Sequence, residues 1–142
     1  MELDRAIRRL EAHNIKGSVP RLAIMQYLID HDTHPTVEEV YQALHGELPT
    51  LSRTTVYNTL RMFSERGAAT LITIDDRRVC YDGNREHHSH FLCKKCGKVF
   101  NMPSDSLDPP RPRPGYGAGF RIDEVQIYYK GLCRECNIST VD

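Results

Sequence analysis

The chain lacks both a net charge and a long apolar run. Its 19 lysines and arginines are balanced by 19 aspartates and glutamates, so any contact with DNA must come from a local basic patch. No stretch approaches the ~20 apolar residues of a membrane-spanning helix, and the charged start at residues 1–5 lacks the apolar stretch of a signal peptide. We therefore expect a cytoplasmic protein that makes no membrane contact and keeps its thiols reduced.

Four of the five cysteines form two CxxC pairs. Cys93 and Cys96 make the first pair, and Cys133 and Cys136 make the second. Each CxxC presents two sulfurs from one tight turn, so two such turns supply the four soft ligands of a tetrahedral Zn(II) site. The spacing favours a structural zinc site over two disulfides or buried thiols. Cys80 has no cysteine near it in the chain, and a buried thiol on a strand is expected there.

The first 66 residues follow a helical pattern. Capping residues and apolar residues at helical spacing predict four helices, which begin near Leu3, Ser18, Thr36 and Ser52. Glu39 stands at the capping-box position after Thr36. The fourth predicted helix ends at Gly67, a residue type that commonly follows a helix.

The pattern changes to β-strands after Gly67. Strands are predicted at 69–74 and 77–82 around an Asp75-Asp76 turn, and later at 91–92, 98–100 and 124–129. A helical cluster followed by a two-stranded hairpin is the outline of a winged helix. The polar stretch 83–86 marks a boundary. We therefore expect an α+β protein with a winged helix-turn-helix domain at 1–83 and a second small domain at 84–142.

The outer face of the fourth predicted helix is the candidate DNA-binding surface. Its guanidinium, hydroxyl and amide groups can reach phosphates and base edges in a major groove, and they belong to Arg53, Thr54, Tyr57, Asn58 and Arg61. Residues 53–66 hold three arginines against one acid, Glu65, which gives a local charge of +2. A solvated polar helix face is the alternative, because such faces are common. Arg77 and Arg78 in the expected hairpin favour a wing that touches the DNA backbone.

Several motifs, in this order, resemble the ferric uptake regulator family. They are Pro20-Arg21, His34-Pro35-Thr36, the stretch 52–60, the stretch 87–98 and the stretch 131–136. The resemblance covers nearly the whole chain and implies a homodimeric, metal-dependent repressor of operator DNA, with a C-terminal α/β dimerisation domain stapled by the Cys₄ zinc. With two CxxC pairs and with Asp82 placed six residues before His88, the chain is most similar to the peroxide-sensing branch. Lys16 and Arg21 complete the expected DNA contacts.

The resemblance also implies a second metal site, built from His34, Asp82, His88 and His90. Imidazoles with one carboxylate suit Fe(II) or Mn(II), whereas four cysteines suit zinc. His88 and His90 are two residues apart in an extended segment, so their side chains share one face. One ion bound by residues of both expected domains would act as a latch that selects the DNA-binding form. Peroxide sensing would then proceed by Fe(II)-catalysed oxidation of a ligand histidine.

Two departures from the family pattern affect these expectations. Asn101 stands where many relatives carry an acidic fifth ligand; its carbonyl oxygen can coordinate a metal but brings no charge. The Pro/Gly-rich run 109–119 replaces the usual amphipathic helix of the dimerisation domain.

Other classes of protein fit the sequence less well. A thiol-disulfide oxidoreductase places its CxxC at a helix start after a strand in a thioredoxin-like pattern, which is not visible here. A zinc hydrolase needs an open coordination position, which four cysteines close. A non-haem iron oxygenase is a further alternative, because the histidines and the aspartate resemble a facial triad. Within the family, the alternative is an iron- or manganese-responsive repressor without peroxide sensing. We do not expect an enzyme.

Overall fold

The computed structural model describes residues 3–75, 78–83, 89–103 and 110–138. The chain divides into two compact units, residues 1–85 and residues 86–142. No helix among the described residues combines the length and the apolar character that crossing a membrane requires.

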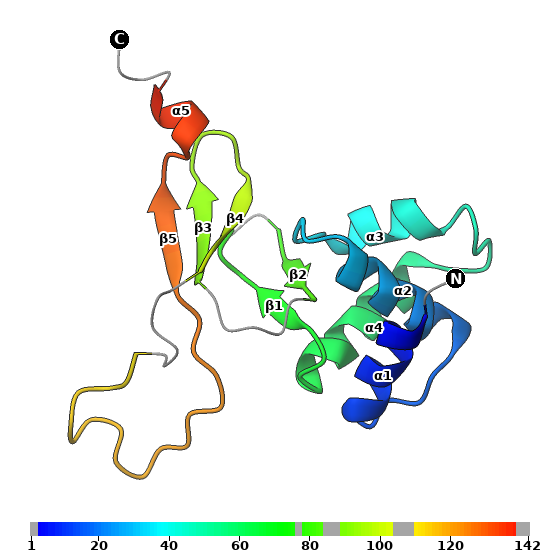
Figure 1. Cartoon of the computed structure of the whole chain (residues 1–142), viewed down its shortest axis with the longest axis horizontal. Helices are drawn as coiled ribbons and strands as arrows, with labels where there is room; N and C mark the ends of the chain where they lie inside the picture. Colours follow the sequence, from blue (N-terminus) through cyan, green and yellow to red (C-terminus); the bar gives the residue numbers. More distant parts are fainter. Residues whose placement is uncertain (1–2, 76–77, 84–88, 104–109, 139–142) are drawn as a thin grey trace. The chain divides into compact units, whose positions relative to one another are not determined.

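The first unit contains a helical cluster followed by a two-stranded hairpin (Figure 1). Its helices are α1 (Asp4–Ala12), α2 (Val19–Asp30), α3 (Val37–Leu44) and α4 (Arg53–Glu65), and its strands are β1 (Thr70–Ile72) and β2 (Cys80–Asp82). The two strands are antiparallel, with Leu71 opposite Tyr81. This order of elements confirms the predicted winged helix.

The predicted capping residues begin α2, α3 and α4. The Ser18 hydroxyl accepts a hydrogen bond from the Arg21 backbone N–H, and the Ser52 hydroxyl accepts one from the Thr55 backbone N–H. Thr36 and Glu39 form the expected capping box. Each cap satisfies a backbone donor that the helix itself leaves unpaired, which stabilises a helix start by about 1 kcal/mol.

Apolar side chains form the buried core of the first unit. Leu10 of α1, Ile24 and Met25 of α2, and Leu60 and Phe63 of α4 are each at most 1% exposed. Side chains of this size each gain roughly 1.5–3 kcal/mol when they are transferred from water. Because α4 contributes its apolar side to this core, its polar side remains at the surface.

The second unit is built on a three-stranded sheet with the order β4-β3-β5 (Figure 1). Its elements are β3 (Ser89–Cys93), β4 (Val99–Met102), β5 (Tyr128–Gly131) and the short helix α5 (Arg134–Ile138). β3 pairs antiparallel with β4 and parallel with β5. A tight turn that contains the first CxxC joins β3 to β4, and Gly97 adopts a φ of 78° there.

The last strand and helix differ from the sequence-based prediction. A strand was expected at 124–129, but β5 begins only at Tyr128. Pairing with β3 sets this position, because His90 donates its backbone N–H to the Ile127 carbonyl and lies opposite Tyr128. Residues 110–127 contain no helix or strand, in agreement with the expectation for the Pro/Gly-rich run. The helix α5 over the second CxxC was not predicted.

Candidate metal sites and DNA-binding surface

The parallel pairing of β3 and β5 brings the two CxxC motifs together. Parallel strands end at the same edge of a sheet, and Cys93 is the last residue of β3, whereas Cys133 follows the end of β5 by two residues. The Lys94 backbone N–H donates to the Gly131 carbonyl at 2.7 Å, which ties the two turns together. The sheet therefore joins sulfurs that are about forty residues apart in sequence.

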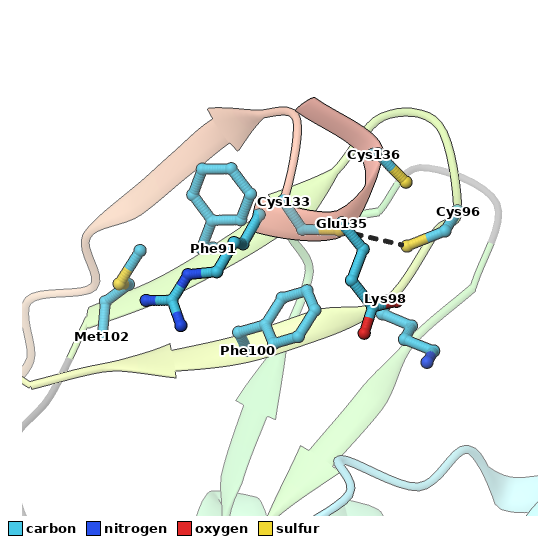
Figure 2. A pocket seen from close by; sticks show the side chains of 9 residues that line it. Phe91, Cys96, Lys98, Phe100, Met102, Cys133, Glu135 and Cys136 are labelled. Atoms are coloured by element: carbon cyan, nitrogen blue, oxygen red, sulfur yellow. Dashed lines mark hydrogen bonds between the residues drawn. The ribbon is translucent and has the colours of Figure 1, made fainter. Parts of the chain in front are cut away.

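The four paired cysteines form a compact sulfur cluster. The Sγ atoms of the four residues all lie within 4.8 Å of one another; the residues are Cys93, Cys96, Cys133 and Cys136. All five cysteines of the chain are free of disulfides. The Sγ atoms of Cys96 and Cys133 are 3.9 Å apart (Figure 2). Four sulfurs at the usual Zn–S distance around a tetrahedral ion would be about 3.8 Å apart. The cluster therefore fits zinc, as the sequence predicted, and argues against the disulfide alternative.

The thiols of this cluster have unequal acidities. The backbone N–H of Cys96 points at the Cys93 sulfur and, with other nearby N–H groups, lowers the pKa of Cys93 to about 5. Hydrogen bonding to the Cys133 sulfur, with the other sulfurs close by, raises the pKa of Cys136 to about 12. Four adjacent thiolates repel one another, and a bound dication removes that penalty. This donor set is therefore suited to a divalent metal.

An apolar pocket of about 450 Å³ borders the sulfur cluster. Phe91 of β3 and Phe100 and Met102 of β4 line it, together with the Cys133–Cys136 segment (Figure 2). Phe100 is 37% exposed and Met102 is 41% exposed. This face of the sheet is thus apolar and accessible.

The predicted regulatory ligands His34 and Asp82 lie together in the first unit. Residues 34–36 run antiparallel to β2: Thr36 bridges Cys80, and the Tyr81 backbone N–H donates to the Pro35 carbonyl. This register places His34 across from Asp82, with 3.6 Å between His34 Nε2 and Asp82 Oδ2 and both side chains 2% exposed. A buried carboxylate requires a cationic or donor partner. Cys80 is also buried on β2, as predicted.

Backbone packing holds both members of this pair. His34 has a φ of 56°, a left-handed conformation that is uncommon for residues other than glycine and is maintained only by its surroundings. Beyond Asp82, the Gly83 carbonyl accepts a 2.8 Å hydrogen bond from Arg9 Nη1, which also donates to the Ala68 carbonyl at 3.0 Å. The sequence does not predict this role of Arg9, because the residues that it contacts are distant from it in the chain.

In the second unit, His90 is buried on the central strand. It lies opposite Asn101 of β4 and opposite Tyr128 of β5, so the three residues form one row across the sheet. Side chains that are directly opposite on neighbouring strands share a face and come within about 5 Å at Cβ. Asn101 is therefore a direct cross-strand neighbour of His90, and its role as a metal ligand stays a prediction. His88 and Arg77 lie outside the described residues.

The outer face of α4 is exposed along its length. All five predicted side chains are exposed, namely Arg53, Thr54, Tyr57, Asn58 and Arg61. Lys16 is also exposed, whereas Arg21 is half-buried and donates to the Lys16 carbonyl at 2.8 Å. Arg21 therefore has a structural contact in addition to its expected contact with DNA.

The local charge of α4 is smaller than the sequence count indicated. Arg53 forms an ion pair with Glu38 of α3 at 2.7 Å, and Arg61 lies 3.7 Å from Glu65. The count along the helix overlooked Glu38, which belongs to another helix. Tyr41 joins the same contact, because its ring centroid lies 4.2 Å from the Arg53 guanidinium carbon.

Comparison with known proteins gives consistent results. The model of the ferric uptake regulator family matches residues 12–130. The peroxide-responsive repressor PerR of Staphylococcus epidermidis is 34% identical over 135 residues, which cover 95% of this chain and 90% of that protein. A structure of the ferric uptake regulator from Pseudomonas aeruginosa with manganese has a TM-score of 0.72 at 21% identity, and the match covers 91% of this chain and 98% of the other. A structure named GAS PerR-Zn-Zn has a TM-score of 0.52 at 26% identity and covers 95% and 87%.

Proposed function

The chain belongs to the ferric uptake regulator family, and from that premise we propose that it is a metal-dependent transcriptional repressor that senses peroxide. The observation that carries the peroxide-sensing part is its 34% identity, over 95% of its length, to a peroxide-responsive repressor. In this proposal residues 1–83 bind operator DNA, and residues 84–142 dimerise and bind metal.

Zn(II) is the structural metal in this proposal, and Cys93, Cys96, Cys133 and Cys136 bind it. The 3.9 Å separation of the Cys96 and Cys133 sulfurs supports this assignment. The metal would hold the ends of β3 and β5 together, in a unit whose described residues contribute only Cys93 to the buried apolar core. The name of the PerR-Zn-Zn structure is consistent with zinc in a related protein.

Fe(II) or Mn(II) is the regulatory metal, and His34, Asp82, His88, His90 and Asn101 are its proposed ligands. Nitrogen and oxygen donors of this kind suit both ions. The buried His34–Asp82 pair and the row formed by His90 and Asn101 support the ligand set. Fe(II) would supply one-electron chemistry toward hydrogen peroxide. The chain's part is to hold an imidazole carbon close enough to gain one of the two peroxide oxygen atoms, while the other would leave as water. Loss of that ligand would weaken metal binding, so the protein would leave its DNA-binding form and dissociate from the operator.

The proposed DNA contacts are Lys16, Arg21, Arg53, Thr54, Tyr57, Asn58 and Arg61. The exposed face of α4 supports this set, because a recognition helix presents such groups to base edges. The proposed homodimer would cover apolar side chains of the second unit, of which Phe100 and Met102 are examples. Free thiols at all five cysteines are consistent with a cytoplasmic location.

One observation favours the second candidate, a metal-responsive repressor without peroxide sensing. Asn101 is neutral, so an ion bound by this ligand set would keep one more positive charge than it would beside an aspartate. A higher positive charge disfavours oxidation of Fe(II), which slows any reaction with peroxide. In either case we propose that the protein turns over no substrate, and the oxygenase alternative would require a released product.

A single experiment distinguishes these candidates. Zinc-loaded protein is mixed with selected operator DNA and with Fe(II), Mn(II) or neither, then exposed to peroxide, and the peptides that contain His34 and His88 are weighed by mass spectrometry. Peroxide sensing predicts operator release and a gain of one oxygen atom with Fe(II) but not with Mn(II). The exposed His45, which follows α3, serves as the internal control: when fragmentation assigns the oxygen to individual histidines, His45 should gain none. Metal-dependent binding without any oxygen gain would support the plain metal-responsive repressor.

A further inference from the structure

Arg53 is the first residue of α4, and a carboxylate on another helix fixes its side chain. Its Nε donates to Glu38 Oε2 at 2.7 Å, and its Nη2 donates to Glu38 Oε1 at 2.9 Å. Two parallel hydrogen bonds of this kind define the guanidinium plane as well as its position. Glu38 itself is held, because it accepts a 3.2 Å hydrogen bond from Gln42 one turn later on α3.

The ring of Tyr41 packs against one face of the same guanidinium. The Arg53 Cζ lies 4.2 Å from the centroid of the Tyr41 ring. Tyr41 is half-buried and stacks on His45, with 5.0 Å between the ring centroids and 9° between the ring planes. Because Glu38 and Tyr41 are three residues apart on α3, they lie on one helix face, and together they restrict both the direction and the tilt of Arg53.

Fold stability does not account for this arrangement. The Arg53 and Glu38 side chains are 58% and 53% exposed, and exposed ion pairs contribute little to stability. Buried residues such as Val40 of α3 and Val56 and Leu60 of α4 already provide the packing of these helices. The ion pair costs side-chain freedom at a surface position. Its effect is to fix the orientation in which the Arg53 guanidinium faces the solvent.

Among the described residues, the hydrogen bonds of Arg53 leave one edge of its guanidinium available. Glu38 occupies the Nε–Nη2 edge, so the remaining N–H groups of Nη1 and Nη2 point along the side chain. This edge can donate two hydrogen bonds to O6 and N7 of guanine in the major groove. The first residues of a recognition helix are the ones that reach base edges.

From this geometry, and resting on the proposed function as a DNA-binding repressor, we infer that Arg53 reads a guanine in each operator half-site and that Glu38 and Tyr41 are its positioning residues. The Glu38 carboxylate also disfavours phosphate contacts near Arg53. The pair therefore favours one base over others, at the expense of non-specific attraction to DNA. The depressed pKa of Glu38, about 2 because of its hydrogen bonds to Arg53, keeps it charged.

The test begins with selection of preferred sites from a random duplex library by the zinc- and Mn(II)-loaded wild type. Affinity is then measured for the selected operator, for operators with each guanine replaced in turn, and for non-specific DNA. Arg53→Lys keeps the charge but loses the planar fork, so its preference for one guanine should fall roughly 5- to 150-fold, with the salt dependence of non-specific binding unchanged. Glu38→Gln should reduce the same preference while non-specific affinity stays equal or rises.

Matched controls separate positioning from charge. Glu47→Gln removes one negative charge from the exposed loop between α3 and α4, and it should leave the guanine preference intact. In the Arg53→Lys background, Glu38→Gln should have no further effect on that preference, because Glu38 acts through Arg53. If Glu38→Gln and Glu47→Gln change all DNA affinities alike, the positioning role is refuted.

Failure of the inference differs from failure of the proposed function. A wild type that selects a defined operator, with a base preference that Arg53→Lys leaves unchanged, overturns the role of Arg53 and leaves the repressor proposal standing. A wild type that selects no sequence with either regulatory metal overturns both.

Discussion

Gly83 provides a direct test of the packing beside the proposed regulatory site. A β-carbon added there would lie 2.9 Å from the Leu28 carbonyl oxygen and 3.0 Å from the Leu28 Cβ, both closer than ordinary contact. Leu28 belongs to the buried core, so it cannot move aside freely. Gly83→Ala must therefore shift the chain that immediately follows Asp82.

The expected cost follows from two opposing contributions. Overpacking of a dense site costs about 1–3 kcal/mol. Alanine also restricts the unfolded chain, which favours the folded state by about 0.4–1 kcal/mol. The net loss in free energy of unfolding should be about 1–2 kcal/mol. With a urea dependence of about 1–3 kcal/mol per molar, the urea midpoint should fall by roughly 0.3–2 M.

The assay is urea unfolding followed by far-ultraviolet circular dichroism, which reports mainly the helices of the first unit. Gly46→Ala is the matched control, because an added β-carbon there has no heavy atom within 4 Å, and its midpoint should not fall. Displacement of Asp82 should also raise the Mn(II) concentration needed for operator binding by about 10- to 100-fold, with zinc content unchanged. Equal midpoints and equal Mn(II) dependence for the two variants would refute the reasoning.

Four further outcomes are expected. Cys96→Ser should release zinc and lower dimer stability in metal analysis and sedimentation, whereas Cys80→Ser should keep its zinc; a fully zinc-loaded Cys96→Ser dimer would exclude the site. Tyr57→Ala or Arg61→Ala should weaken operator binding by about 1–3 kcal/mol at matched salt with zinc content intact, and unchanged affinity for both would move the DNA surface elsewhere. Asn101→Asp should accelerate peroxide-driven release and oxygen gain in the Fe(II) form, and equal rates would show that residue 101 has no influence. The Glu38–Arg53 pair should persist at all pH values above 4.5 and be lost only as the pH falls toward 2, because the folded pKa is depressed; carbon NMR of the Glu38 carboxyl measures this directly.

The sequence predicted those parts of the fold that depend on neighbouring residues. The helix starts at Ser18, Thr36 and Ser52 could be predicted, because a capping side chain bonds to a backbone donor only two or three residues away. The start of β5 was placed wrongly, because its apolar run begins before Tyr128 and only pairing with β3 decides which residues join the ladder. Register depends on a partner about forty residues away, which periodicity does not contain.

The candidate sites follow the same division. The CxxC spacing indicated the sulfur cluster because four soft ligands on two turns have few other uses. The contact of Arg53 with Glu38 and Tyr41 was missed, because it joins two helices through residues that look like ordinary surface positions. The role of Arg9 was missed for the same reason, since Ala68 and Gly83 are distant in sequence.

Both proposed metal sites take a ligand from the strand β3. β3 carries His90 near its start and Cys93 at its end, and the same ladder pairs His90 with Asn101 and with Tyr128. Zinc bound at the cysteines would fix the ends of β3 and β5 against each other, and with them the register of the whole row. A slip of one residue would turn His90 to the opposite face of the sheet. Loss of zinc should therefore disable the regulatory ligands even though no cysteine belongs to that site, which makes the structural metal a precondition of sensing.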